Sequence, residues 1–222
     1  MKTANTVNLF ETATIGEAWL SVAHEIVASG RPSRYDGLPI LEIPRATLEV
    51  DAADPDDPII ARYADAERLA WMRTNFVDHD RVAALGDARS YASRLYDYAE
   101  TGRDQIAWVI ERLRTDPSSR SATITTFEPL IDTTYIPCVS MLDFWIPGDA
   151  VELVAYAHSI DFGAKGYANL IQLAELLGRV GRELDRPAGR LTFVVKSAHI
   201  YDTELDYMKN VLRAAESAGW QA

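Results

Sequence analysis

The chain contains little cysteine and has a deficit of positive charge. Cys138 is the one cysteine among 222 residues, so an internal disulfide framework is excluded, and so is a zinc or redox site built from paired cysteines. The 33 acidic residues exceed the 22 lysines and arginines, which gives a net charge of −11. Binding to nucleic acids or to anionic membranes rests on a basic surface. We therefore expect no nucleic-acid partner, no membrane partner and no bound metal.

Long apolar segments are also missing. No apolar run approaches the roughly 18 residues of a membrane-spanning helix, and residues 1–19 lack the apolar stretch of a secretory signal peptide. Hydrophobic residues nevertheless make up 48% of the chain, enough for a substantial core. The sequence predicts a soluble, cytoplasmic protein.

Two hydrophobic periods alternate along the chain. Apolar residues spaced three and four apart predict helices at 12–30, 61–76, 104–117, 167–184 and 203–219. Thr14 and Glu17 have the spacing of a capping box, and Gly30 stands where a C-cap belongs. Short runs rich in β-branched and aromatic residues predict strands at 40–50, 121–129, 139–146, 151–159 and 190–201. Pro44 predicts an edge strand or a bulge, and segment 31–39 predicts a turn-rich loop. With no repeat and no linker, we expect one α+β domain over residues 1–222.

The candidate site residues are few when each is considered alone. Cys138 follows Pro137 at the start of an apolar run, and its plainest interpretation is a buried cysteine that packs as a small hydrophobe. Four polar residues lie at strand ends or in the loop 158–169, where side chains often line sites: His158, Asp161, Asn169 and His199. Each one singly also fits a capping or core polar residue.

The order of these residues is more informative. The chain contains, in sequence, DPSSR (116–120), PC (137–138), HSIDFGAKGYAN (158–169) and HIY (199–201). This series resembles the thymidylate synthase family, in its compact archaeal-type branch, and the resemblance is strongest over residues 89–210. It implies a three-layer fold, in which helices cover one face of a mixed β-sheet. It also implies transfer of a one-carbon unit from 5,10-methylenetetrahydrofolate to C5 of a pyrimidine nucleotide.

The resemblance implies three catalytic residues. Cys138 matches the family cysteine whose thiolate adds to C6 of the uracil ring, which makes C5 nucleophilic toward a one-carbon electrophile. Tyr91 resembles a tyrosine that assists removal of the C5 proton. Glu67 is the best match to the family's catalytic glutamate, although its spacing to Trp71 is off by one residue, and a solvated helix glutamate is an equal alternative.

A substrate site and a folate site are implied as well. Asn169 matches the residue that reads the base, because a carboxamide can accept a hydrogen bond from N3–H and donate one to O4 of uracil. Asp161 resembles the residue that meets the folate pterin. The other substrate-binding residues that the resemblance implies are Arg34, Arg120, His158, Ser159, His199 and Tyr201. The family fold also implies a homodimer, with Arg120 reaching into the partner's site.

Several positions depart from the family pattern. His158 stands where the family has an arginine that holds the substrate phosphate near the cysteine sulfur, and an imidazole is mostly neutral at pH 7. Ser121 replaces a second arginine, and Val139 replaces a histidine. The sequence stops at ESAGWQA, without the apolar tail that closes over folate in better-known members. These losses predict a specialised relative that modifies an unusual nucleotide or nucleoside.

Three functions stay open. Methyl transfer, in which folate also supplies a hydride, is narrowly favoured because it is the family's usual reaction. A hydroxymethylase of the UMP or CMP type, in which water quenches the intermediate, is weakly favoured by the missing tail. The third is a folate-independent relative that only binds a nucleotide. A thiol kept directly after proline argues against that third function.

Overall fold

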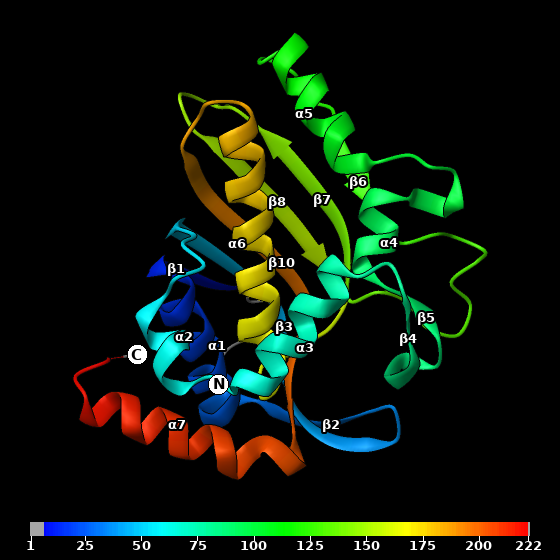
Figure 1. The fold of residues 1–222 in the computed structure, drawn as a ribbon. Helices are drawn as coiled ribbons and strands as arrows, with labels where there is room; N and C mark the ends of the chain where they lie inside the picture. Colours follow the sequence, from blue (N-terminus) through cyan, green and yellow to red (C-terminus); the bar gives the residue numbers. More distant parts are fainter. Residues whose placement is uncertain (1–6, 222) are drawn as a thin grey trace.

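The computed structural model describes residues 7–221, in which one large mixed sheet carries helices on one side (Figure 1). The strands are β1 (Asn8–Thr14), β2 (Arg31–Tyr35), β3 (Leu38–Ala52), β4 (Arg81–Val82), β5 (Ala88–Arg89), β6 (Ala122–Thr125), β7 (Val139–Trp145), β8 (Val151–Ala157), β9 (Ile160–Asp161) and β10 (Ala188–Tyr201). The α-helices are α1 (Ile15–Ser29), α2 (Pro58–Tyr63), α3 (Ala66–Val77), α4 (Tyr91–Tyr96), α5 (Gln105–Thr115), α6 (Gly166–Glu183) and α7 (Leu205–Ser217). None of these helices is long and apolar enough to cross a membrane.

Strands from both ends of the sequence build the main sheet. Its order is β1-β3-β10-β8-β7-β6, with β2 beside β3 and β9 beside β10. The long strand β10 is antiparallel to β3 and parallel to β8, so the sheet is mixed. The late strand β10 therefore joins the N-terminal pair β1-β3 to the hairpin-connected strands β6, β7 and β8.

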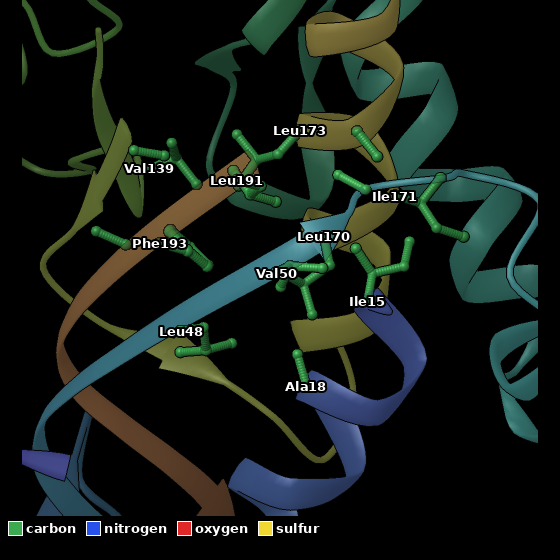
Figure 2. Packing of buried hydrophobic residues seen from close by; sticks show 14 of the residues in the cluster. Ile15, Ala18, Leu48, Val50, Val139, Leu170, Ile171, Leu173, Leu191 and Phe193 are labelled. Atoms are coloured by element: carbon green, nitrogen blue, oxygen red, sulfur yellow. The ribbon is translucent and has the colours of Figure 1, made fainter. Parts of the chain in front are cut away.

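Helices cover one face of this sheet in two layers. Helix α1 packs on β3 and β10, and α6 packs on β10 and β8. Helix α3 lies outside α6, while α2 and α7 lie outside α1. Leu170 and Leu173 of α6 face Val50, Leu191 and Phe193 of the sheet in a continuous buried cluster (Figure 2). The sheet and its two helical layers give the three-layer α+β architecture that the sequence predicted.

Helix α1 begins and ends as the sequence predicted. The Thr14 hydroxyl accepts a hydrogen bond from the Glu17 N–H at 3.3 Å, and the Glu17 carboxylate accepts one from the Ala13 N–H at 3.0 Å. The first bond satisfies an N–H group that a helix start leaves unpaired, and the second ties the residue before the N-cap to the first turn. At the other end, a Cβ on Gly30 would lie 2.3 Å from the Ile26 carbonyl oxygen. Only glycine fits this close approach of the chain to the last helical turn.

The segment that the sequence predicted as a loop at 31–39 is a β-hairpin, so that prediction is wrong. Strands β2 and β3 pair antiparallel, and the turn between them holds Asp36 and Gly37 at φ of 48° and 77°. Two successive positive φ values are typical of the turn whose twist matches a tight hairpin, and Asp-Gly is its common sequence. The dipeptide was the available signal for a hairpin.

The predicted edge position of Pro44 is also wrong. Strand β3 lies inside the sheet, and Pro44 is opposite Ser197 of β10. On its other side, the pairing with β2 ends at Glu42 and the pairing with β1 begins at Ala46. Pro44 thus occupies a gap between two neighbouring strands, where a missing N–H costs no ladder bond.

Two further differences concern the first third of the chain. The sequence predicted no strand before residue 12, yet β1 runs parallel to β3 from Asn8. The single helix predicted at 61–76 is two helices, because the Asp65 side chain accepts hydrogen bonds from the Glu67 and Arg68 N–H groups and starts a new helix there.

Candidate active site

Most of the candidate residues meet at one cavity of about 650 Å³. Seven of them line it: Cys138, His158, Ser159, Asp161, Asn169, His199 and Tyr201. They come from the start of β7, the end of β8, β9, the first turn of α6 and the end of β10. Residues far apart in the sequence are brought together because β8, β9 and β10 end on the same side of the sheet.

His199 lies at the floor of the cavity. Its Nδ1 is 3.2 Å from the Ser159 hydroxyl, and the rings of Tyr35 and Tyr201 flank it at 5.4 and 5.1 Å. Burial lowers the pKa of His199 to about 4, so the ring is neutral at pH 7. The side chain is only 2% exposed, and its Nε2 has no hydrogen-bond partner. A buried polar atom without a partner is costly, and a ligand in the cavity could satisfy it.

The loop between β9 and α6 positions Asp161 and Asn169. Asp161 Oδ1 accepts hydrogen bonds from the Gly163 and Ala164 N–H groups, at 2.9 and 3.3 Å. Burial raises the pKa of Asp161 to about 6 despite these two bonds. The Asn169 amide donates one hydrogen to the Lys165 carbonyl at 2.9 Å. Its second N–H and its oxygen can therefore still meet a ligand, which is the donor and acceptor pair that a uracil edge requires.

Cys138 is held by its backbone on both sides. The His158 N–H donates to the Cys138 carbonyl at 3.1 Å, and the Val139 N–H donates to the Tyr91 hydroxyl at 2.9 Å. Tyr91 is buried and stacks on Phe76 with ring centroids 4.4 Å apart. It lies behind the cysteine rather than in the cavity wall. In this structure Tyr91 contacts the backbone next to the thiol.

The electrostatic surroundings of the thiol are unfavourable for ionisation. Burial raises the pKa of Cys138, and the charges of Asp161 and Asp36 raise it further, while Lys165 lowers it. His158 offers little help, because burial and the nearby Lys196 lower the pKa of its imidazole. A thiol is a weak nucleophile until it loses its proton.

A buried ionic network supports the chain segment that leads to Cys138. The Arg94 guanidinium binds both carboxylate oxygens of Asp132 at 2.7 Å and also donates to the Thr126 carbonyl at 2.7 Å. Arg89 pairs with Glu128 at 2.6 Å. Helix α4 therefore fixes residues 126–132 through Arg94, just as it fixes Val139 through Tyr91.

Besides Tyr91, three predicted site residues lie outside this cavity. Arg34 is exposed, and its guanidinium donates to the Gly37 carbonyl of its own hairpin. Arg120 is exposed and stacks over Trp145 at 5.5 Å. Glu67 faces solvent from the first turn of α3. A shift of one residue turns a side chain by about 100° around a helix, and the next residue, Arg68, points inward to pair with Glu204 at 3.0 Å. This geometry gives Glu67 no contact with the cavity.

Sequence reasoning missed four titratable residues of the cavity wall: Tyr35, Asp36, Tyr135 and Lys165. The first two are placed by the hairpin turn, so the Asp-Gly dipeptide could have pointed to them. Lys165 lies within the recognised loop. In the described wall the carboxylates are Asp36 and Asp161. Within residues 7–221, no three His, Cys, Asp or Glu side chains gather as a metal site.

Comparisons with known proteins identify the family of the chain. The profile of the family described as "Thymidylate synthase" matches residues 37–219. The "Putative thymidylate synthase" of Methanosarcina acetivorans is 38% identical over 154 residues, which cover 66% of this chain and 70% of that protein. The proteins of the same name from Methanosarcina barkeri (38% identical; 71% and 75% covered) and Methanothermobacter marburgensis (28% identical; 90% and 95% covered) are also similar. Because the family profile spans well over half of the sequence, the chain belongs to the thymidylate synthase family.

Proposed function

We propose that the protein transfers a one-carbon unit to C5 of a uracil nucleotide or nucleoside, with methyl as the product, through a covalent adduct between Cys138 and C6. The observation that carries this proposal is the convergence of three groups on one cavity: the Cys138 thiol, the Asn169 amide and the unpartnered Nε2 of His199. A nucleophile, a base reader and a hydrogen-bonding group for the sugar are what this chemistry requires.

The proposed chemistry begins at the thiolate. A sulfur lone pair forms the S–C6 bond, and the C5–C6 π electrons move through C4 onto O4 of the ring. A hydrogen bond from the Asn169 amide to O4 stabilises that developing charge. C5 then bonds to the one-carbon unit and loses its proton to a base, and the bond between that carbon and the donor nitrogen breaks, with its electron pair leaving on the nitrogen. For a methyl product, a hydride then adds to the exocyclic carbon while the electron pair of the S–C6 bond returns to the sulfur, which restores the C5–C6 double bond and the free thiolate.

Asp161 supports a folate as the one-carbon donor. Its carboxyl lines the cavity and receives both of its backbone hydrogen bonds on Oδ1, which leaves Oδ2 available to N–H groups of a pterin ring. When bound, 5,10-methylenetetrahydrofolate supplies the one-carbon unit and, for a methyl product, the hydride that reduces it. Asp161 would orient the ring beside the thiol.

Trapping of the adduct tests the proposal. Fluorine at C5 cannot leave as a proton does, so a 5-fluoropyrimidine substrate should remain bonded to Cys138 in the presence of the folate. We expect mass spectrometry of the intact protein to show this adduct, and peptide mapping to place it on Cys138. The Cys138→Ser variant, of nearly the same size but far less nucleophilic, should form none while still binding the nucleotide. Absence of an adduct with both the 5′-monophosphate and the nucleoside would contradict the proposal.

A further inference from the structure

The cavity has an unusual charge inventory. Lys165 is the one lysine or arginine among the described residues of its wall. It immediately precedes α6 and is exposed to the cavity side of the loop. Its ammonium lies 5.8 Å from the centroid of the Trp71 ring. Within residues 7–221 no carboxylate forms an ion pair with it, so its charge is available to the cavity.

The backbone of Lys165 fixes where that charge is placed. Its N–H donates to the Asp161 carbonyl at 3.0 Å. Its carbonyl accepts from both the backbone N–H and the side-chain amide of Asn169, each at 2.9 Å. Lys165 is therefore anchored between two candidate ligand-binding residues. The face of the Trp71 ring attracts the ammonium, and Lys165 itself lines the same cavity as Cys138.

Ionisation of the Cys138 thiol requires a nearby cation. The arginine that the family has near this sulfur is absent, because position 158 is a histidine. At position 158 the chain has a histidine that is neutral at pH 7, because burial and Lys196 hold the pKa of its imidazole below the usual value. Asp36 and Asp161 both oppose ionisation of Cys138, and Lys165 is the side chain that favours it. An ammonium near a thiolate stabilises the charged form.

We propose that Lys165 is a positioning residue that stabilises the Cys138 thiolate, in place of the arginine that His158 has replaced. This inference rests on the proposed role of Cys138 as the nucleophile. Lys165 therefore has a task of its own, which is to favour ionisation of the thiol. It contacts Asn169 through its backbone carbonyl, so its ammonium is separate from the amide groups of Asn169 proposed to bind the base.

Alkylation of the thiol by iodoacetamide, followed as a function of pH, tests the inference. Because Cys138 is the only cysteine, the rate reports on this site alone. In Lys165→Met the midpoint of the profile should rise, and the rate at pH 7 should fall about three- to tenfold, with the same plateau at high pH; one pKa unit corresponds to a tenfold change in thiolate. Lys165→Arg should keep the wild-type midpoint. The matched control is Lys209→Met, which removes an equal charge from exposed α7, and should also keep it.

Three outcomes would overturn the inference. One is an unchanged midpoint in Lys165→Met. Another is a lower alkylation rate at the high-pH plateau with an unchanged midpoint, which would mean that the substitution changes the access of iodoacetamide to the thiol. The third is an equal shift in Lys209→Met, which would mean a general charge effect. The assay contains no nucleotide and no folate, so its result is independent of adduct trapping. A normal Lys165 effect with no trapped adduct would reject the proposed function alone.

Discussion

At the scale of the residue, the charge on His158 is expected to set the affinity of the cavity for a phosphate. Burial and Lys196 lower the pKa of its imidazole, so the charged form exists only in acid unless an anion binds. A bound phosphate would raise that pKa, because a nearby opposite charge favours protonation. If the substrate carries a 5′-phosphate, its affinity should therefore fall as pH rises from 6 to 8.

His158→Arg tests this role. A guanidinium stays charged throughout that range, so the variant should bind deoxyuridine 5′-monophosphate more tightly at pH 8, by about 1–3 kcal/mol for a charge-assisted hydrogen bond, and with little pH dependence. Calorimetric titration with monophosphates and with the bare nucleosides measures both effects. If the wild type binds nucleoside and monophosphate equally at pH 6 and pH 8, His158 does not serve a phosphate.

Asp161 makes a separate prediction about stability. Its pKa is about 6 in the folded chain against 3.8 for an ordinary aspartate, so the folded state retains the proton longer and loses stability as pH rises between these values. Asp161→Asn removes the buried charge and can keep the oxygen that binds Gly163 and Ala164. We expect it to raise the free energy of unfolding above pH 6 by up to about 2–3 kcal/mol, and to change it little at pH 4.

Thermal melts across this pH range measure that difference. Asp202→Asn is the matched control, since it removes the same charge from an exposed position, and its effect should be small at every pH. A stabilisation of Asp161→Asn that persists undiminished at pH 4 would show that burial of the carboxylate is not its cause.

The sequence identified individual site residues unevenly. The motifs identified Cys138, Asp161, Asn169 and His199, because each lies in a short segment and the order of these segments along the chain matches a known series. The structure brings all four residues to one cavity. Tyr35 enters the wall through a hairpin turn and packs on His199, which is 164 residues away along the chain. The Asp-Gly dipeptide predicts the turn, but no local pattern predicts that Tyr35 packs on His199. Glu67 shows the opposite problem, since an error of one residue in a helix moves a side chain from one face to another.

At the scale of the element, α4 holds the nucleophile segment through a buried ionic contact. Replacing one partner of a buried ion pair leaves the other charge uncompensated, which costs about 3–5 kcal/mol. Arg94→Gln should destabilise the protein by that amount and loosen residues 126–135 before Cys138. Arg190→Gln is the matched control, because Arg190 pairs with Glu49 and Asp51 at the surface, where solvent and salt screen an ion pair and its loss costs little stability.

Urea unfolding gives the two energies, and hydrogen exchange locates the loosening. Equal losses of unfolding free energy in the two variants would show that the buried Arg94 network contributes no more to stability than a surface ion pair. A loss confined to overall stability, with unchanged exchange in residues 126–135, would contradict the role of α4 in fixing that segment.

Helices and strands were predicted correctly where the hydrophobic periodicity and the residue types indicate the same kind of element. Helix α6 and strands β7, β8 and β10 have strong periodic patterns, and each of their ends lies within two residues of its predicted position. Strand β3 was misjudged because the rule for proline assumes an uninterrupted neighbour, whereas β2 and β1 leave a gap opposite Pro44. Strand β1 has few apolar residues, and its pairing with β3 is settled by tertiary contact.

At the scale of the whole molecule, the helices of residues 7–221 cover one face of the main sheet and leave its other face uncovered (Figure 1). Residues such as Val154, Tyr156 and Val194 alternate with core residues and face away from the helices. One helical side cannot bury both faces. We propose that two copies of this single-domain chain pack these faces together, and that Arg120, which lies outside its own cavity, reaches the cavity of the partner.

Mixing of two inactive variants tests the dimer and the shared site together. Arg120→Ala lacks the donated guanidinium, and Cys138→Ser lacks the nucleophile. A heterodimer has one cavity with both intact, so random exchange of subunits should restore about one quarter of wild-type activity. Sedimentation measures the oligomeric state independently. A monomer at micromolar concentration, or no recovery on mixing of dimers that exchange, would contradict this arrangement.

The central place of β10 in the sheet has a consequence for how the protein is made. This strand follows β1–β9 in the sequence, yet it separates β3 from β8 and carries His199 and Tyr201. Until β10 has been synthesised, the edges of β3 and β8 that pair with it in the folded sheet have no partner. Unpaired strand edges and uncovered apolar faces favour aggregation. The cavity that Cys138 lines together with His199 and Tyr201 therefore forms only after β10 has been synthesised.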